Sequence, residues 1–205
     1  VLDALKNHNS EYLYFKTDHH WTADGAYYAY KELMKAKGMT PSPLTDYTKS
    51  EYPGFVGSFY QYSNQSETLK NNPDTVVAYT PTCNDLTYTN TDGQQVSGYV
   101  VSDATKYSEA NKYLCFISGD QPYERIDNPN ITDGSSCVVI KESYGNAFVP
   151  FLVNSYQTVH VVDYRYFSGN LVDLVKDNNI QDVIYVNNAN ALIESAVKNM
   201  SRIIS

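Results

Sequence analysis

The sequence lacks any run of basic residues and any long apolar segment. Its 15 Lys and Arg residues stand against 23 Asp and Glu residues, which gives a net charge of -8 at pH 7. A nucleic-acid-binding surface needs clustered positive charge, and a membrane-spanning helix needs about 18 consecutive apolar residues. We therefore exclude DNA and RNA as expected partners and expect a soluble, globular chain.

Cysteine is scarce, and no pair has the CxxC spacing of a zinc or redox site. The three residues are Cys83, Cys115 and Cys137, an odd number from which no closed disulfide framework follows. Cys115 and Cys137 lie in apolar, strand-like runs, so we expect buried and unreactive thiols. The sequence implies no cofactor.

Tryptophan is also scarce, with one residue against 20 tyrosines, and Asn, Ser and Thr are plentiful. This composition is typical of cell-surface and secreted proteins. We expect the protein to be extracytoplasmic. The chain begins at Val1 rather than Met, which is compatible with an export signal that has been removed. A length of 205 residues predicts a single domain over residues 1–205.

Hydrophobic periodicity predicts an α/β fold. Residues 11–16 are aromatic and short like a strand, and apolar positions then recur at helical spacing from Ala23 to Met34. The C-terminal part repeats strand then helix three times, with strands at 136–142, 159–164 and 182–187 and helices near 148–152, 171–175 and 192–200. We expect a parallel sheet flanked by helices and buried on both faces.

Residues 41–135 read as a β-rich insertion. Helical periodicity disappears there, and residues 86–101 predict a hairpin that turns at Asp92-Gly93. The insertion is rich in tyrosine and returns to the sheet before the strand at 136–142, so we expect it to form one wall of the active-site cleft. Its aromatic rings are suited to the C–H faces of sugars.

Polar residues follow the predicted strands, where the ligands of a parallel sheet bind. Asp18, His20 and Ser143 have the side chains of acyl-transfer catalysis: a serine nucleophile, a histidine that takes its proton, and a carboxylate that orients the histidine. Further side chains at the same edge are candidates for the oxyanion and substrate site. They are Arg165, Asn187, Asn188, His19 and Tyr144.

The segment YLYFKTDHHWTADGAYYAYKEL resembles the namesake motif of the bacterial DHHW proteins, which are similar to the alginate O-acetyltransferases of the SGNH-hydrolase-like superfamily. The segment VIKESYGNAFVPFLVNSYQTVHVVDYRYF resembles the serine block of that group. The resemblance implies a permuted motif order, with Asp-x-His before the serine block. It also implies that Asp18 is the orienting acid, His20 the base and Ser143 the nucleophile.

The function expected from this resemblance is a serine-dependent O-acetyltransferase or esterase that acts on cell-surface or secreted polysaccharide through an acyl-Ser143 intermediate. Its partners would be a polysaccharide or oligosaccharide acceptor and a membrane protein that supplies the acyl group. A catalytically silent, glycan-binding surface protein is the main alternative.

Asp18, His19 and His20 also invite a metal-dependent phosphoesterase interpretation. Such enzymes need several further aspartates in short arrays, whereas the later strand ends offer Ser, Arg and Asn. We therefore expect no metal. Trp21 is expected to pack and hold its loop, and His160 to face solvent.

Overall fold

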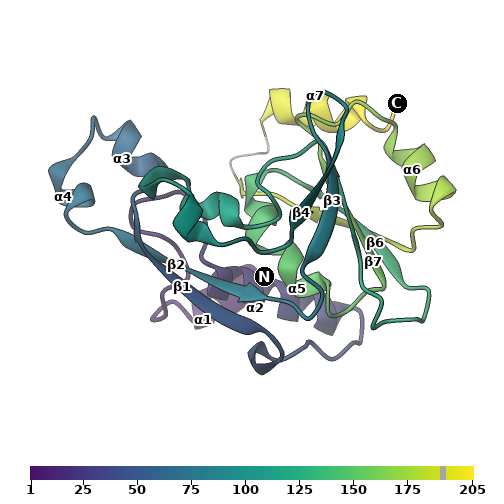
Figure 1. The fold of residues 1–205 in the computed structure, drawn as a ribbon, viewed down its shortest axis with the longest axis horizontal. Helices are drawn as coiled ribbons and strands as arrows, with labels where there is room; N and C mark the ends of the chain where they lie inside the picture. The colour runs from purple at the N-terminus through teal and green to yellow at the C-terminus, as the bar shows by residue number, and fades with distance from the viewer. Residues whose placement is uncertain (190–192) are drawn as a thin grey trace.

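The computed structural model describes residues 1–189 and 193–205. Its main feature is a six-stranded mixed sheet in the order β4-β3-β5-β7-β6-β8, beside a two-stranded antiparallel sheet of β1 and β2 (Figure 1). The strands are β1 (Thr48–Phe55), β2 (Asp74–Thr80), β3 (Asp85–Thr89), β4 (Gln95–Tyr99), β5 (Tyr123–Asp127), β6 (Ser136–Lys141), β7 (Thr158–Asp163) and β8 (Asp182–Val186).

Short and medium helices connect the strands, and within the described ranges none is long and apolar enough to cross a membrane. The α-helices are α1 (Leu2–Asn7), α2 (Ala23–Ala36), α3 (Ser58–Tyr62), α4 (Glu67–Lys70), α5 (Val149–Leu152), α6 (Leu171–Asp177) and α7 (Glu194–Arg202). The 3-10 helices are η1 (Leu44–Asp46), η2 (Ala104–Lys106), η3 (Glu109–Cys115) and η4 (Ser143–Ala147).

Strand β6 is the centre of the fold, and all six of its residues are buried. It runs parallel to both β7 and β8. Val139 packs into the core that contains α2 and α5, whereas Val138 and Ile140 pack into a second core against Leu171 of α6 and Met200 of α7. Two apolar faces explain why β6 reads as a continuous apolar run rather than an alternating one.

Only three of the six strands of the main sheet form the parallel arrangement that was expected. Strands β7, β6 and β8 are parallel, but β5 joins β7 antiparallel and carries the β3–β4 hairpin on its outer side. Three strands of the 41–135 insertion therefore extend the main sheet. The hairpin turn at Asp92-Gly93 is confirmed, and Gly93 adopts the positive φ of +77° that such a turn favours.

The strand predicted for residues 11–16 is wrong. Leu13 and Phe15 are buried while Tyr12 and Tyr14 are exposed, which is strand-like alternation. The segment nevertheless pairs with its own following loop, through a single bridge between Tyr14 and Trp21, rather than with the sheet. Alternating burial records a buried face and cannot identify the pairing partner.

The third predicted helix, 192–200, is observed as α7 (Glu194–Arg202), while Leu192 lies outside the described residues. The expected burial of Cys115 and Cys137 is confirmed, and both are free thiols. Burial raises the pKa of both thiols, which keeps them protonated and unreactive.

Candidate active site

The loop between Thr17 and Trp21 is anchored on both sides. The Asp74 carboxylate, at the start of β2, accepts hydrogen bonds from Thr17 N at 2.7 Å and from Thr17 Oγ1 at 2.6 Å. At the other end, Thr22 caps α2 by accepting a hydrogen bond from Gly25 N. The loop therefore enters and leaves the site along fixed directions.

Asp18 is a buried residue of this loop, with 5% of its surface exposed. Its Oδ2 accepts a hydrogen bond from Ser58 N at 2.8 Å, and its Oδ1 accepts one from His20 N at 3.0 Å. Gly57 allows this close approach, because a Cβ there would lie 2.3 Å from the Cβ of Asp18. The carboxylate is thus fixed by residues of the insertion as well as by its own loop.

His20 connects Asp18 to Ser143. Its Nδ1 lies 2.6 Å from Asp18 Oδ1, and its Nε2 lies 2.7 Å from Ser143 Oγ. The histidine is 7% exposed, so these contacts form largely away from solvent. The contacts expected among the three side chains are therefore present, although Asp18 and Ser143 are separated by more than half of the chain.

Electrostatics keep Asp18 ionised. Burial raises the pKa of its carboxyl, but the hydrogen bond and charge of His20 and the backbone N–H groups of Ser58 and His20 outweigh burial and hold the pKa far below its ordinary range. An ionised carboxylate at Nδ1 leaves Nε2 as the nitrogen that can accept a proton from Ser143.

His19 packs beside His20, with ring centroids 3.9 Å apart. Its Nδ1 lies 2.7 Å from Ser58 Oγ. Burial, followed by the neighbouring His20, lowers the pKa of His19, so this imidazole is uncharged at neutral pH. The carbonyl of His19 also accepts a hydrogen bond from the Tyr144 hydroxyl, which joins the histidine loop to the serine segment.

Tyr113 of η3 completes the packing around the imidazole. Its ring stacks on His20, with centroids 4.1 Å apart and an interplanar angle of 13°. Its hydroxyl donates a hydrogen bond to the Ser143 carbonyl at 3.0 Å. Tyr113 of the insertion is thus a buried ring that contacts the histidine and the serine segment, which is a different role from the sugar-binding one expected of the insertion's tyrosines.

Ser143 begins η4, directly after β6, and has a second side-chain partner. Its Oγ lies 3.2 Å from Glu142 Oε2, while Glu142 Oε1 accepts a hydrogen bond from Asn188 N at 2.9 Å. Asn188 therefore contributes to the site through its backbone, by holding Glu142. Neither motif predicted a role for Glu142, although its position next to Ser143 in the sequence could have indicated one.

Arg165 is held in a buried ion-pair network. Its guanidinium contacts Asp163 at 2.6 Å and Asp120 at 2.9 Å, and Lys141, which is fully buried, lies 3.2 Å from Asp163 and 3.3 Å from Asp120. Burial raises the pKa of Asp120, but the two cations outweigh it and hold that pKa at about 2. Within the described ranges, no hydrogen bond or ion pair joins Arg165 to the catalytic candidates.

Asn187 lies directly after β8, beside Trp21. It lines a groove with Trp21, Phe148 and residues of α2 and β8, and its Oδ1 is buried without a hydrogen-bond partner in the described part of the chain. The hydrogen bonds of Ser143 Oγ in the described part of the chain go to His20 and Glu142, and none joins it to the Asn187 amide. Trp21 itself is 6% exposed and donates a hydrogen bond to the Tyr144 carbonyl, so it packs and holds its loop as expected.

A ligand atom from each of Asp18, His19 and His20 lies within 4.8 Å of the others, which is close enough for a metal ion. These atoms already have protein partners: both Asp18 oxygens and His20 Nδ1 are hydrogen-bonded, and His20 Nε2 faces Ser143. A metal ion would have to displace these contacts. The donor set thus fits a hydrogen-bonded chain better than a metal centre.

His160 does not face solvent as expected. It lies in β7 with 1% exposure, and its Nδ1 is 2.8 Å from the Tyr123 hydroxyl. Burial lowers its pKa to about 4, so the imidazole is uncharged. The buried strand around His160 was predicted from the sequence. The hydrogen-bond partner of its ring, Tyr123, lies in β5, and the local sequence does not indicate that β5 pairs with β7.

Comparison with known proteins gives one family match. The family model described as "DHHW protein" matches residues 1–162. A crystal structure of a DHHW family protein from Eubacterium siraeum superposes with a TM-score of 0.89 and 33% identity, covering 99% of this chain and 68% of that one. A comparison with curated proteins gives no match.

Bacillus cereus PatB1 has a similar fold. One PatB1 structure superposes with a TM-score of 0.73 and 26% identity over 91% of this chain and 65% of that chain. A second, with a sulfonyl adduct, gives a TM-score of 0.75 and 23% identity over 96% of this chain and 67% of that one. The chain thus spans about two thirds of the length of the structures it matches. The mixed α/β fold is shared with these proteins.

Proposed function

We propose that this chain, which belongs to the DHHW family, is an extracytoplasmic serine-dependent O-acyltransferase or esterase that acts on polysaccharide. The observation that carries the proposal is the continuous set of contacts from Asp18 through His20 to Ser143 Oγ. The resemblance of the two motif blocks to the alginate O-acetyltransferases favours acetyl as the acyl group. A membrane protein that supplies the acyl group is a proposed partner.

The reaction proceeds in two halves. Ser143 Oγ adds to the carbonyl carbon of an acyl ester while its proton passes to His20 Nε2, and Asp18 stabilises the resulting imidazolium. The tetrahedral intermediate then collapses. The bond to the departing alcohol breaks, the alcohol oxygen takes the proton from His20, and the acyl group remains on Ser143.

The second half reverses these steps with a new hydroxyl. A sugar hydroxyl, or water, gives its proton to His20 and attacks the acyl carbon, and Ser143 leaves and regains the proton. Transfer and hydrolysis differ only in which hydroxyl reaches the acyl carbon. Backbone N–H groups at the start of η4 are the proposed oxyanion donors, since Arg165 and the Asn188 N–H are already engaged by carboxylates.

The test is acetate release from 4-nitrophenyl acetate by the purified protein, with and without a chelator. Ser143→Ala is expected to lower kcat/KM by about 10³-fold or more, and the chelator to have no effect. Ser63→Ala, which changes an exposed serine near α3, is the matched control and is expected to retain full activity. Activity that survives Ser143→Ala and disappears with the chelator would instead support a metal-dependent phosphoesterase type of site.

A catalytically silent glycan-binding protein is the competing proposal. It predicts no acetate release and no labelling of Ser143 by phenylmethylsulfonyl fluoride. This reagent labels an activated serine, whose oxygen displaces fluoride from the sulfur atom. The proposed enzyme is expected to gain one sulfonyl group on Ser143, located by peptide mass spectrometry. Asp18→Asn is expected to slow this labelling, because the imidazolium loses its carboxylate partner.

A further inference from the structure

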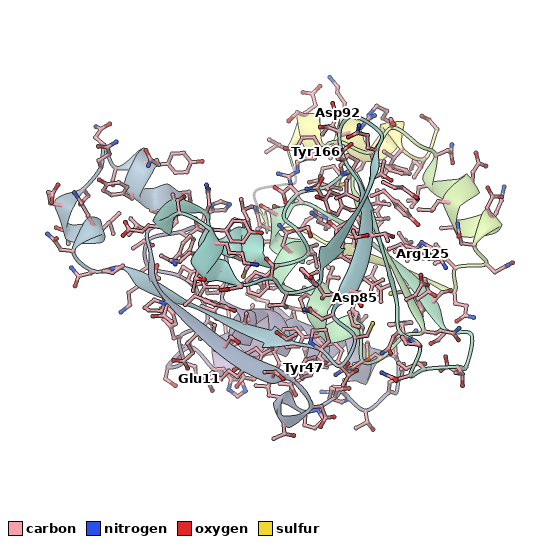
Figure 2. The ribbon with its side chains drawn as sticks, viewed as in Figure 1. Glu11, Tyr47, Asp85, Asp92, Arg125 and Tyr166 are labelled. Atoms are coloured by element: carbon pink, nitrogen blue, oxygen red, sulfur yellow. The ribbon has the colours of Figure 1, made fainter. Side chains whose placement is uncertain are left out.

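A cavity of about 380 Å³ lies between the tip of the β3–β4 hairpin and the loop that follows β7. Figure 2 places Asp92, at the hairpin tip, beside Tyr166 in that loop. We infer that this cavity binds an uncharged oligosaccharide, which is the acceptor chain if the proposed function holds. Its walls are formed by Thr89, Asn90, Thr91, Gly93, Pro122, Tyr123, Tyr166, Phe167, Ser168, Gly169 and Leu174.

Aromatic rings form one side of the cavity. Tyr166 is 47% exposed, and the rings of Tyr123 and Phe167, which also line the cavity, have their centroids 6.4 Å apart. The Arg165 guanidinium stacks on Tyr166 at 5.1 Å from the ring centroid, which supports the ring in place. An exposed, supported ring offers an apolar face to the C–H groups of a sugar.

The lining also contains side-chain hydroxyl groups. Thr89 and Thr91 come from the hairpin, and Ser168 comes from the loop after β7. None of these three side-chain hydroxyls has a hydrogen-bond partner in residues 1–189 or 193–205. Each can both donate and accept, which matches the mixed donor and acceptor character of sugar hydroxyls. A lining with both aromatic rings and unpaired hydroxyls thus suits a sugar better than a purely apolar ligand.

The lining also decides the charge of the ligand. Among the described residues that line the cavity there is no Asp, Glu, Lys or Arg, although the whole chain carries a net charge of -8. Arg165, which stacks on the lining residue Tyr166, is already paired with Asp120 and Asp163. A uronic-acid polymer requires cationic partners for its carboxylates, and this cavity offers none. The acceptor is therefore a neutral glycan rather than a polyuronate.

A chain of contacts links the cavity to the serine segment. Arg165, which stacks on Tyr166, pairs with Asp120, and Asp120 accepts a hydrogen bond from Asn146 at 2.9 Å. Asn146 and Ser143 belong to the same turn of η4. The cavity and the serine therefore lie along the same edge of the sheet. An extended glycan bound at Tyr166 has further sugar units with which to reach Ser143.

Binding is tested without turnover, in a Ser143→Ala background, by electrophoresis in gels that contain a soluble polysaccharide. The gels hold hydroxyethylcellulose, glucomannan, xyloglucan or dextran as neutral glycans, and polygalacturonate as the anionic one. We expect retardation in at least one neutral gel and none in polygalacturonate. Tyr166→Ala is expected to weaken binding about three- to ten-fold, whereas Tyr166→Trp retains it.

Tyr99→Ala is the matched control, because Tyr99 is 53% exposed on the same hairpin but lies outside the cavity, and it is expected to bind as the parent does. The inference is overturned if no neutral gel retards the protein, if polygalacturonate retards it equally, or if Tyr166→Ala binds unchanged. Because the assay needs no catalysis, such a result leaves the Ser143 chemistry standing. Conversely, if the gels retard the protein but the wild type releases no acetate from 4-nitrophenyl acetate, the proposed enzymatic function is contradicted and the glycan-binding site is supported.

Discussion

The ring of Tyr113 lies face to face with the imidazole of His20, at 4.1 Å between centroids, and its hydroxyl is hydrogen-bonded to the Ser143 carbonyl. One buried side chain of the insertion therefore contacts both the proposed base and the backbone of the proposed nucleophile. Its contacts restrict the ring plane of His20 and the position of Ser143 together. We propose Tyr113 as a positioning residue, because it touches the proposed catalytic groups and not the reacting bond.

Replacing Tyr113 separates these two effects. Tyr113→Phe keeps the stacking ring and loses the hydrogen bond, so kcat/KM for 4-nitrophenyl acetate is expected to fall about three- to ten-fold. Tyr113→Leu loses both contacts and is expected to fall further, by roughly 100-fold. Tyr107→Phe, which removes a hydroxyl contact to Ser102 elsewhere in the insertion, is the control. Equal activities for Tyr113→Leu and wild type would contradict the positioning role.

Gly57→Ala is expected to displace Asp18, because the new Cβ would lie 2.4 Å from Asp18 Oδ2. The expected result is a loss of about 10²-fold or more in kcat/KM together with a lower Tm. Gly98→Ala creates a similar contact, at 2.5 Å from Ser118 Oγ, on the hairpin. That control is expected to lose stability and keep its activity. Activity measured well below both Tm values separates the two effects.

The lowered pKa of Asp18 predicts an acid-dependent contribution to stability. A carboxyl whose pKa is lower in the folded state stabilises fully above its unfolded pKa of about 4, and this contribution is lost as the pH falls toward the folded pKa. The difference in the free energy of unfolding between wild type and Asp18→Asn should therefore be constant from pH 7 to 5 and shrink below about pH 4. Urea unfolding measures it.

Asp92→Asn is the control for this pH series, since Asp92 is exposed at the hairpin tip. Its difference from wild type is expected to be small throughout the range. An Asp18→Asn difference that stayed constant down to pH 2 would show that the carboxylate is not stabilised by its neighbours in the folded protein.

Lys141→Met tests the ion-pair network behind the serine. The fully buried ammonium lies between Asp163 and Asp120, and its removal leaves buried negative charge with Arg165 as the remaining cation. We expect a loss of about 3–5 kcal/mol in the free energy of unfolding. Lys37→Met, which removes an ion pair to Asp182 at the surface, is expected to lose about 1 kcal/mol or less. Equal losses would contradict the assignment.

Local sequence order was sufficient for the parallel part of the fold. The apolar runs that became β6, β7 and β8 are separated by helical segments, so their type could be read directly. Strands β6 and β7 are buried on both faces as expected, whereas β8 is buried on one face only, because Val183 and Tyr185 are exposed. The hairpin at Asp92-Gly93 was also readable, because its turn depends on two adjacent residues. Residues 11–16 were misread because their burial alternates as in a strand while their partner is the next loop.

The sequence by itself determined the chemical identity of the site. Asp18, His20 and Ser143 could be named from residue type, motif and position after predicted strands, since these properties are local. The tertiary structure decided which other groups meet them. Tyr113, Gly57 and Asp74 reach the site across 39 to 95 residues of chain, counted from the loop at Asp18 or Thr17, and their contacts depend on how the insertion folds back.

Contacts from distant segments also explain where the structure places Arg165, Asn187 and Asn188. Their positions after strands predicted side chains close to the serine. Two carboxylates hold Arg165, Asn187 lines a groove with Trp21, and the backbone N–H of Asn188 binds Glu142 beside the serine. A strand end specifies the edge of the sheet where a residue lies. The direction of its side chain is decided by the charges and hydrogen-bond partners that distant segments bring to that edge, and only the folded chain contains them.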